Sequence, residues 1–223
     1  MQDDAGRYLD QEAQILIHER HWATLEALTS KNSDAVSIAE VVEAVATVHH
    51  ECTHALGPSN PAKNHGYSRL RDDTRKMEDR LAALFLEEAT ADVWTRHTLQ
   101  QFILETGIDR LDPRLQRCAY DVRYLDLVSV LEAVILDIGK LAGPSFYDLT
   151  QLLAREVPDT RGERFAELVL GTQPQPDKTN PNPRQRIAEE LERLFYEFDT
   201  RVGNGEDVGA NAIARFAGLI VRR

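Results

Sequence analysis

Hydrophobic residues recur along most of this chain at intervals of three and four positions, the spacing that places them on one face of an α-helix. Segments in which hydrophobic and polar residues alternate strictly, as in a half-buried strand, are nearly absent. The pattern predicts helices over approximately residues 11–28, 38–56, 67–106, 113–141, 145–156, 161–170, 183–202 and 208–221. We therefore expect a mainly α fold.

The N-terminal region is where the pattern is ambiguous. Residues 13–18 hint at a strand, whereas residues 11–28 as a whole read equally well as a helix. A small edge sheet near the N-terminus is therefore compatible with an otherwise helical domain.

Proline spacing divides the chain near its C-terminus. The stretch of residues 172–186 is polar and contains Pro174, Pro176, Pro181 and Pro183. This composition predicts a linker. Residues 1–171 are long enough to form a single compact helical domain with a substantial core. Residues 187–223 have an amphipathic pattern and are expected to form a helical segment that packs back on this domain.

The charge and composition of the chain indicate which partners and which cellular compartment to expect. A formal net charge of −11 argues against nucleic acid as a partner, because phosphate binding needs clustered Lys and Arg. No segment resembles a membrane span or a signal peptide, so we expect a cytoplasmic protein with no membrane association. The two cysteines, Cys52 and Cys118, are expected to be packed thiols. The oligomeric state and export by a dedicated secretion system stay open.

The helix predicted over residues 38–56 has recognisable signals at both ends. Ser37 and Glu40 have the spacing of a capping box, which begins a helix. Gly57 followed by Pro58 is typical of a helix C-terminus. The last two turns before Gly57 are therefore expected to be helical.

The segment His50-Glu51-Cys52-Thr53-His54 lies in those last two turns. Two histidines four positions apart lie on the same face of a helix, so both rings can reach a single cation. Glu51 is turned aside from that face and can take a proton from a water molecule instead of binding the metal. The arrangement predicts a zinc-dependent hydrolase with His50 and His54 as ligands.

A third ligand is predicted on the next helix. Catalytic zinc usually takes three protein ligands and leaves a fourth position for water. Glu88 and Asp92 are four positions apart, and the small residues Ala89 and Ala91 beside them allow close approach to the metal helix. We expect Glu88 to bind zinc and Asp92 to accept a hydrogen bond from the distal N–H of a ligand histidine.

Together, His50-Glu51-x-x-His54 and Glu88-x-x-x-Asp92 resemble the paired signatures of the gluzincins, the thermolysin-like and neprilysin-like zinc metallopeptidases. The resemblance covers the two signatures and the residues between them. It implies a zincin-like helical domain that hydrolyses a peptide or protein substrate. It also implies that His50, His54 and Glu88 bind Zn²⁺, that Glu51 is the general base, and that Asp92 orients a ligand ring.

The same residues admit two alternatives. Gly57 extends the motif to the H-E-x-x-H-x-x-G pattern of metzincins, but their third ligand would fall on Asn60, a poor zinc ligand, and His65 lies too far along. The alternative from another functional class is a non-catalytic helical interaction protein, or a pseudoenzyme, with a structural or vestigial zinc site. A fourth protein ligand, such as Cys52 or His65, would favour that interpretation.

A peptidase also needs a donor that stabilises the developing oxyanion, typically His, Tyr or Arg. The candidates that follow the Glu88 helix are Tyr120, Arg123 and Tyr124, and those that follow the metal helix are His65 and Tyr67. For the tyrosines, half-buried rings with satisfied hydroxyls are the competing interpretation.

Three other histidines are expected to take no part in the site. His49 points elsewhere on its helix and is predicted to be exposed. His18 and His21 are three positions apart, which predicts a surface cluster rather than a second metal site.

Overall fold

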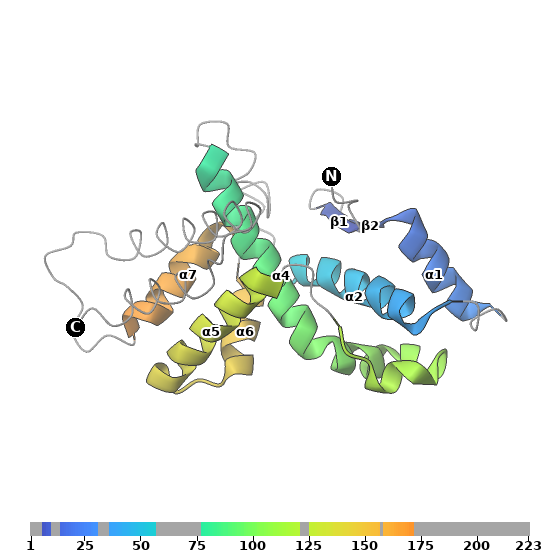
Figure 1. Cartoon of the computed structure of the whole chain (residues 1–223). Coiled ribbons are helices and arrows are strands. Elements are labelled where there is room, and N and C mark those ends of the chain that lie inside the picture. Colours follow the sequence, from blue (N-terminus) through green and yellow to red (C-terminus); the bar gives the residue numbers. More distant parts are fainter. Residues whose placement is uncertain are drawn as a thin grey trace, which may run out of the picture.

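A computed structural model of the chain describes residues 6–9, 14–30, 36–56, 77–120, 125–156 and 158–171. Within these ranges the fold is mainly α, as the sequence predicts (Figure 1). The predicted linker over residues 172–186 and the helices predicted beyond it lie outside the described residues.

The elements follow one another in an order that starts with two strands and continues with helices. The strands are β1 (Gly6–Leu9) and β2 (Gln14–Ile17). The α-helices are α1 (Glu19–Thr29), α2 (Ile38–His54), α4 (Met77–Thr106), α5 (Leu125–Ala142), α6 (Phe146–Arg155) and α7 (Pro158–Gly171). Two short 3-10 helices, η2 (Ile108–Arg110) and η3 (Pro113–Arg117), lie between α4 and α5.

The N-terminal strands form a two-stranded antiparallel ribbon. Gly6 lies opposite Ile17, and Leu9 lies opposite Gln14. The strand hint over residues 13–18 is therefore confirmed, and a helix over all of residues 11–28 is wrong. Helix α1 begins only at Glu19, where the ring of His18 accepts a hydrogen bond from the backbone N–H of Arg20 at 3.2 Å and caps the first turn.

The continuous helix predicted over residues 113–141 is also wrong. Asp112 caps η3 by accepting a hydrogen bond from the Arg114 N–H at 3.0 Å, and Pro113 occupies its first turn. Backbone at Cys118 is extended, so the chain leaves the helix there, and α5 starts at Leu125. The local capping and proline signals thus outweigh the longer hydrophobic period.

Helix α4 is the spine of the molecule. Figure 1 shows α1 and α2 on one side of it and α5, α6 and α7 on the other. Each side has its own hydrophobic cluster, and α4 contributes to both. The cluster with α5, α6 and α7 contains Leu86, Ala89 and Val93 of α4 together with Val128, Leu131, Ile135, Leu149, Leu153 and Phe165. The cluster with α1 and α2 contains Leu99 and Ile103 of α4 together with Leu28, Val41, Val45 and Leu115.

Helix α2 begins with the capping box that the sequence predicts. The Ser37 hydroxyl oxygen accepts from the Glu40 N–H at 3.2 Å, and the Glu40 carboxylate accepts from the Ser37 N–H at 3.0 Å. The helix ends at His54, with Ala55 as the cap residue. Gly57 and Pro58, the predicted stop signal, lie outside the described residues.

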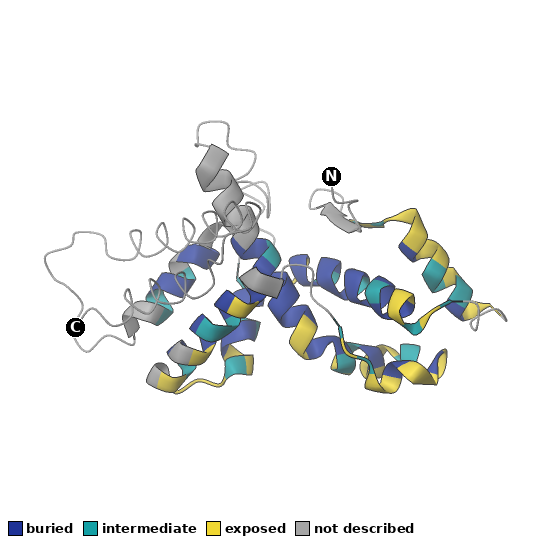
Figure 2. Ribbon diagram, viewed as in Figure 1, coloured by how far each residue is buried: buried dark blue, intermediate teal, exposed yellow. Residues whose placement is uncertain are grey.

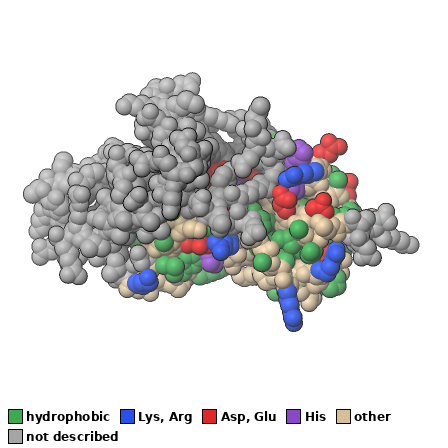
Figure 3. Space-filling view, in the orientation of Figure 1, with side chains coloured by type: hydrophobic (Ala, Val, Ile, Leu, Met, Phe, Trp, Pro, Cys, Tyr) green, Lys and Arg blue, Asp and Glu red, His purple; other side chains and the backbone are tan. Residues whose placement is uncertain are grey.

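The described surface is mixed in character. In Figure 3 the basic side chains of the described part lie among acidic, hydrophobic and uncharged ones. None of the helices in the described ranges combines the length and the hydropathy needed to cross a bilayer.

Candidate metal centre

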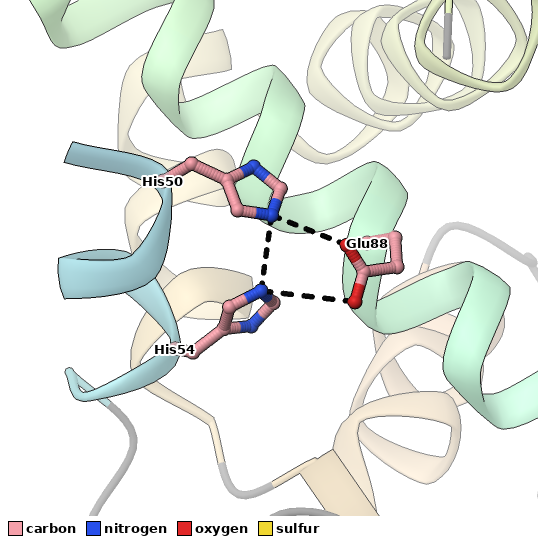
Figure 4. Close-up of side chains that lie close together, drawn as sticks. All are labelled: His50, His54 and Glu88. Atoms are coloured by element: carbon pink, nitrogen blue, oxygen red, sulfur yellow. Dashed lines mark hydrogen bonds and ion pairs between the residues drawn. The ribbon is translucent and has the colours of Figure 1, made fainter. Parts of the chain in front are cut away.

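The C-terminal turns of α2 pack against the middle of α4, and both faces at this contact are buried (Figure 2). His50, His54 and Glu51 are buried on α2, Asp92 is fully buried on α4, and Glu88 is half-buried beside it. Figure 4 shows the rings of His50 and His54 projecting from α2 toward the carboxylate of Glu88. The structure thus brings the three predicted ligands together from two helices.

The distances between the three donors describe a compact triangle. The two Nε2 atoms are 3.0 Å apart, His50 Nε2 is 3.2 Å from Glu88 Oε2, and His54 Nε2 is 3.8 Å from Glu88 Oε1. A tetrahedral cation with bonds of about 2.0–2.1 Å separates its ligand atoms by about 3.3 Å. The donor set therefore matches the size of a metal site, and this cluster can bind a metal ion.

The far nitrogens of the two rings are held by two more carboxylates. His50 Nδ1 donates to Asp92 Oδ1 at 2.7 Å, and His54 Nδ1 donates to Glu87 Oε1 at 2.7 Å. Because an ionised carboxylate only accepts, each Nδ1 carries a hydrogen. By the same rule His50 Nε2 also carries a hydrogen that it shares with Glu88, and a metal ion would replace that proton. The predicted hydrogen bond between Asp92 and one of the two histidines is present, and the histidine is His50.

Two unprotonated Nε2 atoms only 3.0 Å apart would repel each other through their lone pairs, so a proton or a metal ion between them is favoured. Burial lowers the pKa of His50, but hydrogen bonds with Asp92 and Glu88 outweigh it and raise the pKa to about 10. Burial lowers the pKa of His54, and the neighbouring positive charges of His50 and Arg161 act in the same direction. The site therefore favours one positive charge between the rings, which a proton supplies when no metal is bound.

Glu87 and Arg161 belong to the site and were missed by the sequence analysis. Glu87 is buried, and its Oε2 forms an ion pair with the Arg161 guanidinium of α7. The sequence signal for Glu87 is its position directly before Glu88. Arg161 had no such signal, because it lies on a helix far along the chain and only the fold brings it to Glu87.

His49 is not exposed, so that prediction is wrong. It is buried between α2 and α4, where its Nε2–H donates to the Thr98 hydroxyl at 2.7 Å. The Thr98 hydroxyl itself donates to the Trp94 carbonyl at 2.7 Å and is therefore free to accept. The ring also stacks on Phe102, with centroids 4.3 Å apart. Burial and the adjacent His50 lower the pKa of His49 to about 4, so it is neutral at pH 7.

The remaining candidates fall into two groups. Tyr120 is half-buried and packs against both hydrophobic clusters. Arg123, Tyr124, His65 and Tyr67 lie outside the described residues. The surface cluster predicted at His18 and His21 is half right, because His18 is exposed whereas His21 is buried.

Among the described residues, the side chains whose donor atoms gather within metal-binding distance are those of His50, His54 and Glu88. Cys52 is half-buried, and burial raises the pKa of its thiol. Within the described ranges the cluster therefore offers three side-chain ligands, and His65, the other candidate for a fourth ligand, lies outside those ranges. Comparisons of the chain with protein-family models, with curated proteins and with solved structures gave no match.

Proposed function

We propose that this protein is a zinc-dependent metallopeptidase with a gluzincin-like metal centre. The observation that carries the proposal is the convergence of the His50 and His54 Nε2 atoms on the Glu88 carboxylate, with each Nδ1 held by its own carboxylate. The order of donors along the chain and the contact between Asp92 and the first histidine add support, because both match the implications of the paired signatures.

The donor set favours zinc among the common divalent metals. Two neutral imidazoles and one carboxylate form a site of the His₂Glu type, which suits a tetrahedral cation with one position left for water. Mg²⁺ and Ca²⁺ prefer six or more oxygen ligands, and the described part of the cluster offers oxygen only from Glu88. We therefore propose zinc as the resident metal.

The charge of the cluster also favours a divalent cation. Glu51, Glu87, Glu88 and Asp92 lie at the contact between α2 and α4, and Arg161 forms an ion pair with one of them. Carboxylates removed from water are destabilising unless cations or hydrogen-bond donors compensate them. A bound Zn²⁺ would offset much of the excess negative charge.

In the proposed reaction, Glu51 is the general base. It follows His50 directly on α2, it is buried, and its negative charge raises the pKa of His54, which supports a place for it near the ligand rings. When zinc is bound, it supplies a Lewis acid that polarises the scissile carbonyl and makes water more acidic. The Glu51 carboxylate takes the proton of the attacking water and passes it to the leaving amine.

Metal analysis together with an isosteric change at Glu51 tests the proposal. The purified protein should carry about one zinc ion per chain. Glu51→Gln should abolish cleavage of a diverse peptide library and leave zinc content and thermal stability nearly unchanged, because glutamine keeps the shape of the side chain but accepts no proton. The matched control is Glu43→Gln, the same substitution on α2 at a residue that instead pairs with Arg20.

Two outcomes would contradict the proposal in different ways. If the wild-type protein lacks stoichiometric zinc, the proposed metal centre itself is wrong. Stoichiometric zinc without cleavage of the peptide library or of protein substrates, or equal activity of wild type and Glu51→Gln, would favour a non-catalytic metal-binding protein.

A further inference from the structure

The two ligand histidines are held by different parts of the molecule. The His50 ring is held by Asp92, within the contact between α2 and α4. The His54 ring is held by Glu87, and Glu87 is in turn held by Arg161 from α7. The second histidine is therefore connected to the far side of the α4 spine, whose hydrophobic cluster includes α5, α6 and α7.

The Glu87 carboxylate spans two partners. Its Oε1 accepts from His54 Nδ1 at 2.7 Å, and its Oε2 forms the ion pair with Arg161. A carboxylate with a partner on each oxygen cannot rotate without breaking one of the two contacts. Because both Glu87 and Arg161 are buried, water is poorly placed to replace either partner.

Arg161 is itself fixed by the corner between α6 and α7. Its Nε donates to the Leu153 carbonyl at 2.8 Å, and its Nη2 donates to the Glu156 carbonyl at 3.1 Å. These carbonyls lie at the C-terminal end of α6, where the Leu153 carbonyl also accepts from the backbone N–H of the cap residue Glu156 at 3.2 Å. The planar guanidinium thus donates to backbone carbonyls at the end of α6 and forms the ion pair with Glu87 at the same time.

We propose that Arg161 is a positioning residue for the metal centre, acting through Glu87 to hold the His54 ring so that its Nε2 faces the cation. This inference rests on the proposed metal centre and adds the helix corner α6–α7 to it. A ring that is free to turn presents its lone pair less often, so the metal site depends on a helix that contributes no ligand.

The direction in which metal affinity changes when Arg161 is removed distinguishes a positioning role from a purely electrostatic one. A guanidinium near the site repels a divalent cation, so its removal would tighten metal binding if charge alone mattered. If Arg161 positions Glu87 and His54, its removal weakens metal binding instead. If Arg161 only stabilises the end of α6, its removal would lower the stability of the metal-free protein and leave the metal affinity of the folded protein unchanged.

The experiment compares zinc affinity, by competition with a chromophoric chelator, in the wild type, Arg161→Gln and Arg161→Lys. We expect Arg161→Gln to bind zinc about 10- to 100-fold more weakly, the usual effect of losing an outer-shell partner, and Arg161→Lys to recover part of the loss. The visible spectrum of the Co²⁺-substituted protein should change in Arg161→Gln, because it reports ligand geometry. The matched control is Arg164→Gln, also on α7, which breaks the more exposed ion pair with Glu167 and should leave both readouts unchanged.

A paired variant keeps the test decisive if Arg161→Gln fails to fold. Glu87→Gln/Arg161→Gln removes both charges and leaves no buried ion without its partner. We expect it to bind zinc about 10- to 100-fold more weakly than the wild type, because the two residues act as one unit. Zinc affinity and Co²⁺ spectrum equal to wild type in this variant, or tighter zinc binding in Arg161→Gln, would overturn the inference. If the wild type binds no zinc, the proposed metal centre is wrong, and this result is distinct from a failure of the role proposed for Arg161.

Discussion

The two ring nitrogens differ in their contacts, both in His50 and in His54. One nitrogen of His50 and one of His54 donate to carboxylates at 2.7 Å, which leaves the other nitrogen of each ring as a donor to a metal. The same carboxylates that orient the rings also raise the electron density on them. If the cluster binds a metal, Asp92 and Glu87 would therefore influence its affinity and geometry without being ligands.

At this scale we expect Asp92→Asn to keep the fold and to weaken zinc binding about 10- to 100-fold. Asparagine fits the space but accepts more weakly, so it holds the His50 tautomer less firmly. Chelator competition measures the change. Asp109→Asn is a suitable control because Asp109 accepts from Gln116 on the neighbouring 3-10 helix. Unchanged affinity in Asp92→Asn would show that the His50 ring is held by packing alone.

The pKa of His49 predicts a loss of stability in acid. Its folded value of about 4 lies below the ordinary 6.5, so between these two values the unfolded chain binds a proton that the folded chain does not. Stability is therefore fully present above pH 6.5 and falls as the pH is lowered, by up to about 3 kcal/mol near pH 4.

Urea unfolding at pH 7 and pH 4.5, with chelator present throughout, measures this contribution. His49→Gln keeps a donor for Thr98 but carries no charge at either pH, so its stability should fall less than that of the wild type between the two conditions. It should be less stable than the wild type at pH 7, because it loses the stacking on Phe102. Parallel acid sensitivity in both proteins would place the titrating group elsewhere.

At the scale of elements, α2 has separate stabilising and functional ends. The capping box of Ser37 and Glu40 satisfies backbone N–H groups in its first turn, and His50 and His54 lie in its last two turns. Between them the helix buries Val41, Val45 and Ala46 against α1 and α4. The apolar face therefore sets the rotation of the helix, and that rotation directs both histidines toward α4.

We expect Ser37→Ala to lower the free energy of unfolding by about 1 kcal/mol, the typical effect of losing an N-cap side chain. Zinc affinity should not change, because the cap lies at the opposite end of the helix from His50 and His54. Urea denaturation and chelator competition on the same samples check both statements. A tenfold loss of zinc affinity would mean that the last turns of α2 depend on the cap to form.

At the scale of the whole molecule, a metal ion bound at the cluster would join elements that are otherwise held by packing. Its ligands come from α2 and α4, and the outer residue Arg161 comes from α7. A ligand that binds the folded state alone stabilises that state according to its concentration and affinity. Zinc should therefore stabilise both sides of the α4 spine.

Free zinc at a hundredfold excess over its Kd should add about 2.7 kcal/mol of stability and raise Tm by about 5–10 °C for a chain of this size. Thermal unfolding with zinc and with chelator measures the difference. Glu88→Ala should lose this increment, since two imidazoles alone hold zinc poorly, whereas Glu87→Ala should lose only part of it. An equal increment in Glu88→Ala would indicate that zinc binds elsewhere on the chain.

Most of the sequence-based predictions that the structure confirms depend on interactions between residues close together in the chain. Hydrophobic spacing and the capping signals determined the mainly α fold and the start of α2, because helices form from contacts within a few residues. The four-residue spacing of His50 and His54 likewise placed both rings on one face. The failures over residues 11–28 and 113–141 arose where a cap or a proline interrupted a longer hydrophobic pattern.

The tertiary structure decided what surrounds these groups. His49 is one position from His50 and has the same chemistry, yet it is buried against Thr98 and Phe102 only because α4 covers that side of α2. Arg161 reaches Glu87 only because α7 packs against α4. The spacing of Glu88 and Asp92 indicated the hydrogen bond between Asp92 and a histidine. The burial of His49 and the ion pair of Glu87 depend on segments far apart in sequence, so local spacing does not record them.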